Sequence, residues 1–459
     1  MISCQSENIS KRAEKLYIIE QVLFIAMVAL RLVAIYNTDV MLCTHDEKNL
    51  SDWVTTQYGH WGYMQYLYQH RSFPDTFYFQ YYHPPLFHIV GALLMWVLRA
   101  DSSTQRLLLA IKLVQMVNCL ASIGATFFCW KTLRRLSAPS GIRLTLSALL
   151  FFFPPFFHLA RETNNDAFMA LFVLGSVYFT VEWYRKHTLG NILRISVCII
   201  LGMWSKSSAL LVAPAIGSVF LYTLITEKEN RKSLLRQYGV FSIVTIPLGL
   251  AWLLHNYFAF RIPFNYVHRA AETATFAKVS ELSAWERYGL PAFSQLKTVA
   301  VSMEDIKGNG NIWMQTIRTM NSDEMVYWDG NRMISAVGIT MQAVSIVIVF
   351  LLLFGSLIGL CGRQIGIAYK SLFTTMFGAL FGSYLLFSVQ FPYIYTMNFR
   401  YIVPCIMPLT VGCSIGTGTM RRRTIFEALL AVSVAAYCVL VVEGVYFGNV
   451  HLWKLVNCL

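Results

Sequence analysis

Asp46 and Glu47 form the acidic pair around which this chain is organised. They closely follow the first long apolar run, and residues 44–86 around them are rich in His, Tyr and Trp. An acidic pair at a membrane face, covered by aromatic residues, suits an enzyme that handles a polar head group on a lipid tail. The alternative is that both carboxylates, next to Lys48, are solvated loop residues without a catalytic role.

A second acidic motif, Glu162 and Asp166, lies at the start of a later apolar run. The two residues are four apart, so a helix that begins at Glu162 would present both on one face. Alternatively, one of residues 163–165 caps the helix and Asp166 lies in its first turn. We expect capping and a functional role together, and we expect Asn165 to line the substrate site.

Lys206 and Arg400 are the candidate phosphate-binding cations. Lys206 separates two apolar runs, and Arg400 stands between Phe399 and Tyr401 at the start of another. Charged groups at membrane depth cost roughly 2.5–3.5 kcal/mol each, so they usually pair or serve a site. An ammonium and a guanidinium fork both bind phosphate oxygens. The alternatives are a plain hairpin turn at Lys206 and an interfacial arginine at position 400.

The histidines of the first polar segment invite a metal-site interpretation. They are His45, His60, His70 and His83. Their spacing matches no compact zinc motif, and the sequence contains no HExxH. We therefore expect no metal and no other cofactor, with a divalent ion as the alternative.

Transmembrane helices are the elements that must position these groups. The chain has 459 residues, is 56% hydrophobic and has a mean hydropathy of +0.51. Several of its runs reach the roughly 18 apolar residues that a spanning helix requires. The runs are solid rather than alternating, which argues against an outer-membrane barrel. We expect one polytopic, all-α membrane domain over residues 1–459.

The net charge of +13 reflects basic residues at the ends of apolar runs, so we expect no nucleic-acid partner. The basic start of the chain places the N-terminus in the cytoplasm and the acidic motifs outside. The run 84–98 is short and opens with Pro-Pro, so we expect an interfacial helix within a first outer loop, 37–105. About eleven spans follow from the charge rule, with a second outer loop, 255–332, built of short helices and turns.

Taken in order, the motifs resemble those of a known family. They are the acidic motif after the first span, HPPL, RETNND, GMWSKSSALLVAPA and FRYIVPCIMPL. This order is similar to that of the lipid-phosphate-sugar glycosyltransferases of family 39, in their bacterial multi-pass branch. That family includes the protein O-mannosyltransferases and the aminoarabinose transferase of lipid A. The resemblance extends to about residue 415 and implies a GT-C fold.

The resemblance also implies roles for individual residues. Asp46 would be the general base, with Glu47 as the alternative, and Lys206 and Arg400 would bind the donor phosphate. Either Glu162 or Asp166 would fill the second acidic position. The hairpin around Lys206 departs from the family in lacking its Gly-Pro. The residues expected to line the substrate site are His45, His60, Tyr63, His83, Asn165 and Tyr401.

The implied activity is inverting transfer of a sugar from a polyprenyl-phosphate-linked donor to an acceptor hydroxyl on a lipid, glycan or protein. It would take place at the outer face of a bacterial plasma membrane, and one carboxylate base would suffice because phosphate is already a good leaving group. The competing hypotheses are a transporter or flippase of lipid-linked sugars and a catalytically inactive relative. A transporter should show inverted repeats and mid-membrane charges, whereas this chain gathers its charges at one face.

Overall fold

The structure, a computed structural model, describes residues 2–38, 40, 59–75, 80–137, 140–264, 266, 277–299, 305–323 and 332–447. Across these residues the regular elements are helices, and the β pairing is limited to one bridge between Lys278 and Tyr393. Ten helical stretches are long and apolar enough to cross a membrane. The all-α polytopic architecture predicted from the sequence is confirmed.

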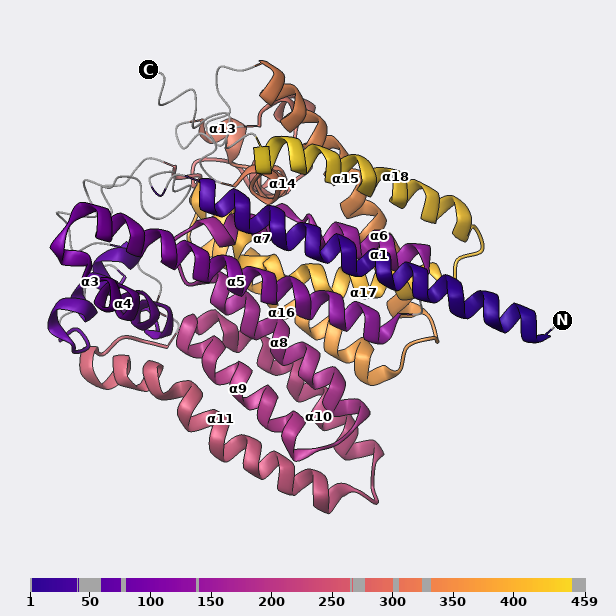
Figure 1. Ribbon diagram of the computed structural model, residues 1–459, viewed down its shortest axis with the longest axis horizontal. Coiled ribbons are helices and arrows are strands. Elements are labelled where there is room, and N and C mark those ends of the chain that lie inside the picture. Colours follow the sequence, from indigo (N-terminus) through magenta and orange to yellow (C-terminus); the bar gives the residue numbers. More distant parts are fainter. Residues whose placement is uncertain are drawn as a thin grey trace.

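The long helices form one bundle (Figure 1). Their bounds are α1 (Ile2–Asn37), α5 (Thr104–Leu136), α6 (Gly141–Phe151), α7 (Pro154–Arg161), α8 (Asp166–Arg185), α9 (Leu189–Ser205), α10 (Ala213–Thr226), α11 (Arg231–Phe260), α15 (Arg332–Cys361), α16 (Ile367–Gln390), α17 (Ile406–Thr417) and α18 (Arg423–Val441). The 3₁₀ segments η2 (Ser207–Val212) and η5 (Phe399–Cys405) lead into α10 and α17.

The sequence predicts about eleven spans, one more than the ten stretches among the described residues. The difference is α9. This helix has 17 residues, fewer than any of the ten, and it is the predicted fifth span. It nevertheless packs along α8 and α11 within the bundle. A helix of this length covers about 25 Å, slightly less than the hydrocarbon core of roughly 30 Å.

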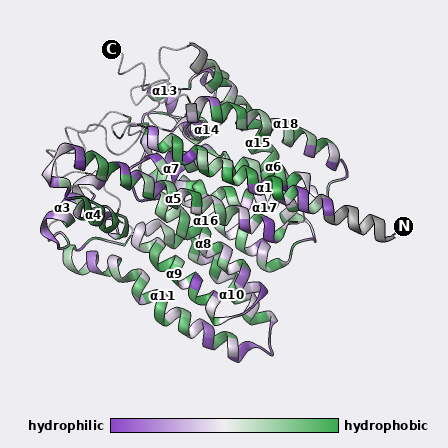
Figure 2. Ribbon diagram, in the orientation of Figure 1, coloured by the Kyte–Doolittle hydropathy of each residue, from purple (hydrophilic) through white to green (hydrophobic). Residues whose placement is uncertain are grey.

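The helix surfaces match a lipid environment. Hydrophobic residues dominate the middle lengths of the helices, and hydrophilic residues gather towards their ends (Figure 2). Large apolar side chains face outward, such as Phe350, Ile243 and Val432, which are 68%, 76% and 71% exposed. In water such a surface would be an aggregation hazard, whereas acyl chains solvate it.

Helices α3 (Gly59–His70) and α4 (Leu86–Leu98) lie side by side at the end of the bundle opposite the chain's N-terminus (Figure 1). α4 has 13 residues and is therefore about 20 Å long, too short to cross the bilayer core. This agrees with the interfacial helix predicted for residues 84–98. The Tyr82 carbonyl, just before α4, accepts hydrogen bonds from Trp252 and Asn256 of α11 at 3.2 and 2.8 Å.

The described part of residues 255–332 contains short helices. They are α12 (Ala284–Tyr288), η3 (Phe293–Lys297), α13 (Ile306–Asn309) and α14 (Ile312–Ser322). Arg318 is fully buried among them and donates to the carbonyls of Gln295, Thr298 and Gly308 and to the side chain of Asn309. Burial lowers the pKa of the Arg318 guanidinium to about 10. The hydrogen bonds of this one buried arginine therefore connect α14 to η3 and α13.

Candidate functional site

The turn between α7 and α8 carries the second acidic motif. Pro154 and Pro155 begin α7 after a break in the predicted third span, and α7 ends at Arg161. Two amide side chains of α5 then hold the following backbone. Gln115 donates to the carbonyl of Arg161 at 2.9 Å, and Asn118 donates to the carbonyls of Glu162 and Asn164 at 2.7 and 2.9 Å. These buried hydrogen bonds fix the path of the turn.

Helix α8 begins at Asp166, and Glu162 has an extended backbone before it. The interpretation that the two carboxylates share one helical face is therefore wrong, because the helix starts four residues too late. The capping interpretation agrees with the structure in part: Asn165 is the N-cap residue of α8, but its side chain makes no cap hydrogen bond. The side-chain oxygen of Asn164 accepts a hydrogen bond from the Asp166 amide at 3.0 Å, and Asp166 lies in the first turn.

Asp166 and Lys206 form an ion pair. Asp166 is 1% exposed as a side chain and Lys206 is 16% exposed, so water screens the pair only weakly. Lys206 ends α9 with an extended backbone, and the Asn165 side chain donates to the carbonyl of Ser205 at 2.7 Å. The hairpin at Lys206 is therefore docked onto the acidic turn through one ion pair and one hydrogen bond.

The aromatic ring of Tyr401 lies close to both candidate cations. The Lys206 ammonium lies 5.5 Å from the centre of its ring, and the Arg400 guanidinium lies 5.0 Å from the same ring. Arg400 also donates to the Tyr401 hydroxyl at 3.0 Å, and its amide donates to the Asn398 side chain at 2.8 Å. Positions 166, 206 and 400, far apart in the sequence, thus meet at one end of the bundle.

Glu162 has a different partner from Asp166. Its carboxylate lies 3.5 Å from the Arg161 guanidinium, and both side chains are nearly buried. The five charged residues of this group, Arg161, Glu162, Asp166, Lys206 and Arg400, carry three positive and two negative charges, a sum of +1. Such a group can receive an anionic phosphate where the phosphate oxygens meet the cations directly.

His60, Tyr63 and His83 belong to a cluster on α3 and at the start of α4. The His60 Nδ1 and His88 Nε2 atoms are 2.9 Å apart, and the rings of His60 and His83 stack at 5.3 Å. The rings of Tyr63 and His88 lie 4.3 Å apart. Burial lowers the pKa of His88 well below its ordinary value, with His60 as a second cause. Burial likewise raises the pKa of the Tyr63 hydroxyl.

Three predicted residues, His45, Asp46 and Glu47, lie outside the residues that the structure describes. Their place relative to Lys206 therefore stays a prediction, as does a single cavity that surrounds the acidic and basic groups. As for metals, the described ranges contain no grouping of three or more His, Cys, Asp or Glu side chains that could hold an ion.

The sequence analysis missed several residues that support the site. Gln115 and Asn118 stand out only as two amides inside a long apolar run, which is a usable signal at membrane depth. His88 is a lone histidine in an apolar run, and nothing in the sequence around it indicated a contact with His60. Asp323 is 2% exposed and accepts from Asn398 at 3.2 Å, which brings a further carboxylate close to the start of η5. With Asp323 included, the six charges sum to zero.

Residues 83–255 match the model of a protein family described as dolichyl-phosphate-mannose-protein mannosyltransferase. This range contains the acidic turn and Lys206. No curated protein sequence matches the chain. Among solved structures, the crystal structure of ArnT from Cupriavidus metallidurans in the apo state is similar at 14% identity with a TM-score of 0.41, over 90% of this chain and 76% of that chain.

The family match agrees with the resemblance carried by the motifs HPPL, RETNND and GMWSKSSALLVAPA, which all lie within or at the edge of residues 83–255. The matched range lies in a chain whose described residues include ten helical stretches long and apolar enough to cross a membrane. Residues 83–255 of this chain are therefore similar to the dolichyl-phosphate-mannose-protein mannosyltransferase family.

Proposed function

We propose that this protein transfers a sugar, with inversion, from a polyprenyl-phosphate-linked donor to an acceptor hydroxyl. The observation that carries the proposal is the meeting of Lys206, Arg400 and Tyr401 beside the buried carboxylate of Asp166. Three segments widely separated in sequence supply these groups. The family matched over residues 83–255 is named for enzymes whose sugar donor is a lipid phosphate.

The chemistry of the leaving group gives each cation a task. When the bond between sugar and phosphate breaks, negative charge grows on the phosphate oxygens. The Lys206 ammonium and the Arg400 guanidinium can stabilise that charge because they are already held in place before the reaction. The Tyr401 ring lies near both cations, and its hydroxyl accepts a hydrogen bond from Arg400.

The two described acids then have different roles. Asp166 is the counter-ion of Lys206, so it orients the ammonium towards the phosphate and is a positioning residue. Glu162 is held against Arg161. The proton of the acceptor hydroxyl needs another base, and we assign this role to Asp46, with Glu47 as the alternative.

Loop charges support an extracytoplasmic site. The opposite ends of the helices carry Arg134 and Arg135 in the last turn of α5, Arg185 at the end of α8 and three consecutive arginines, residues 421–423, at the start of α18. By the positive-inside rule these ends lie in the cytoplasm, together with the N-terminus. The end with Lys206 then faces outward, where a lipid-linked donor and an acceptor can meet in a bacterial plasma membrane.

Transfer from a defined donor tests the proposal. Full-length protein in lipid nanodiscs would receive a radiolabelled polyprenyl-phosphate sugar and a panel of hydroxyl acceptors. We expect transfer by the wild type, loss of transfer with Lys206→Ala, and normal transfer with Lys297→Ala, which removes an exposed lysine elsewhere. Unchanged transfer by Lys206→Ala would overturn the assigned role. Movement of intact donor across a vesicle bilayer without release of sugar would favour a transporter instead.

A further inference from the structure

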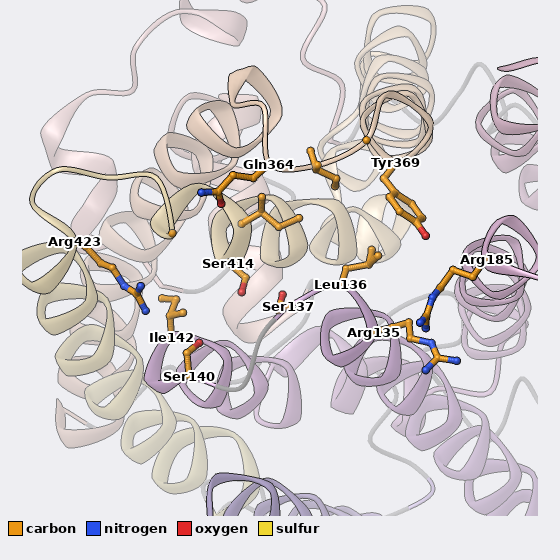
Figure 3. A pocket seen from close by; sticks show the side chains of 14 residues that line it. Arg135, Leu136, Ser137, Ser140, Ile142, Arg185, Gln364, Tyr369, Ser414 and Arg423 are labelled. Atoms are coloured by element: carbon orange, nitrogen blue, oxygen red, sulfur yellow. The ribbon is translucent and has the colours of Figure 1, made fainter. Parts of the chain in front are cut away.

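A second polar region lies far from Lys206. It is a cavity of about 470 Å³ between the ends of α5, α8 and α17 and the starts of α6, α16 and α18 (Figure 3). α8 shows the separation, because it begins at Asp166 in the candidate site and ends at Arg185 in this cavity. Its 20 residues extend over about 30 Å. The cavity therefore lies at the opposite membrane face and is distinct from the transfer site.

The cavity is lined by hydrogen-bond donors and cations. Arg135 and Arg185 line one side and Arg423 the other, with the Tyr369 hydroxyl on the side of the first two (Figure 3). Arg135 is held by Glu182 through two contacts of 2.5 Å, and Arg423 is held by Glu427 at 2.9 Å. Among the described residues Arg185 has no carboxylate within ion-pair distance. The lining therefore offers one unneutralised guanidinium.

Two serine hydroxyls in the cavity lack a hydrogen-bond partner among the described residues. Ser414 is 8% exposed, and its neighbours Thr410 and Thr417 on α17 both donate to a backbone carbonyl four residues earlier, whereas Ser414 does not. The Ser137 hydroxyl is buried and also unpaired. Both hydroxyls point into the space between α5 and α17 (Figure 3). Both hydroxyls can therefore donate a hydrogen bond to an acceptor bound in the cavity.

Helix dipoles add to the positive potential. The first turns of α6, α16 and α18 all border the cavity, through Ser140, Gly366 and Arg423. Gly366 and Arg422, the N-caps of α16 and α18, make no side-chain cap hydrogen bond, so amides of these first turns stay available. The C-terminal ends of α5, α8 and α17 oppose this effect, and Arg135 and Arg185 compensate it at the ends of α5 and α8.

We propose that this cavity binds the phosphate-bearing head group of an anionic membrane lipid. The free charge of Arg185, the donor hydroxyls of Ser137 and Ser414 and the open helix starts all select a phosphate oxygen. The cavity lies where spanning helices end, which is the depth of lipid head groups. Basic pockets between helices at this depth are a usual way to hold phospholipids. The inference does not depend on the transfer reaction.

Binding to purified full-length protein in mild detergent tests the proposal. Native mass spectrometry would measure Kd values for phosphatidylglycerol, phosphatidylcholine and inorganic phosphate. We expect the anionic lipid to bind most tightly. Its binding should weaken about fivefold with Arg185→Gln, because an unpaired arginine near an anionic head group contributes about a factor of five, and at least as much with Arg185→Gln/Arg423→Gln. Ser414→Ala, which removes only the hydroxyl, should weaken it severalfold.

The matched control is Lys232→Gln/Arg236→Gln, which removes two exposed charges from α11 at the same face, away from the cavity. This variant should bind phosphatidylglycerol as the wild type does. Equal losses in the two double variants would overturn the site, since general surface charge would then explain binding. If inorganic phosphate bound tightly and with the same dependence on Arg185, the cavity would be a site for free phosphate and not for a lipid head group.

Discussion

Lys206 donates a hydrogen bond to the carboxylate of Asp166 across 40 residues of sequence, and this ion pair joins the two hairpins of the candidate site. The lysine ends one helix and the aspartate begins the one before it, so the pair ties the end of α9 to the start of α8. Asn165 reinforces the junction through the Ser205 carbonyl at 2.7 Å. The position of the ammonium towards Tyr401 therefore depends on the acidic turn.

Asp166→Asn should damage both stability and transfer. It leaves the Lys206 ammonium partly buried without a counter-ion, and removal of one partner of a buried pair costs about 3–5 kcal/mol, less here because Lys206 is 16% exposed. We expect a lower Tm and weaker donor binding. The double variant Asp166→Asn/Lys206→Gln should recover much of the Tm but none of the transfer. A double variant no more stable than Asp166→Asn would contradict the pairing.

Asp46→Asn should abolish transfer and leave the fold and donor binding largely intact. Asparagine keeps the shape and can hydrogen-bond the acceptor, but it cannot take the proton. A positioned base contributes about 10²–10⁴ in rate, so the loss should appear in kcat rather than in donor affinity. Glu47→Gln is the matched control. If Glu47→Gln loses turnover and Asp46→Asn keeps it, the base is Glu47. If both variants keep full activity, neither carboxylate is the base.

Lys206→Ala and Arg400→Ala should behave differently from Asp46→Asn. Each removes a charge that meets the phosphate before and during bond cleavage, so donor binding and kcat/KM should both fall. Lys206→Arg should recover binding in part, because it restores the charge with a different shape. Donor affinity would be measured by competition with a labelled polyprenyl phosphate. Normal affinity in both alanine variants contradicts a phosphate site at these residues.

The sequence predicted the helical class and the short helix at residues 84–98 because apolar length and loop charge are local signals. It also singled out Lys206, Asp166 and Arg400, since charges beside apolar runs are costly and therefore informative. It did not predict that Asp166, rather than Glu162, pairs with Lys206. That choice depends on where α8 begins, and the start of a helix after a turn held by Asn118 is decided by tertiary hydrogen bonds.

Asn118→Ala should loosen the acidic turn without touching its charges. The change deletes hydrogen bonds to the carbonyls of Glu162 and Asn164, and each buried acceptor left unpaired costs about 1–3 kcal/mol. We expect a lower Tm and a several-fold loss of kcat, because Asp166 no longer holds Lys206 at one position. Cys119→Ala, at the next and equally buried residue of α5, is the control. A kcat loss no greater than that of Cys119→Ala argues against the turn as a positioning element.

His88 should make the α3–α4 region sensitive to acid. Burial lowers its pKa well below the ordinary value of about 6.5, so the folded protein holds a neutral ring where the unfolded chain would bind a proton. Below about pH 6.5 the unfolded state therefore takes up more protons, and the stability contributed by neutral His88 is lost as the pH falls. His60, whose ring nitrogen lies 2.9 Å away, accentuates the effect because two protonated rings would repel.

Hydrogen exchange of α3 and α4 at pH 5 and 7.5 measures this loss of stability, with His88→Asn as the comparison. We expect the wild type to lose protection at pH 5 and the variant to show little change between the two pH values; equal pH dependence in both proteins would remove His88 as the cause.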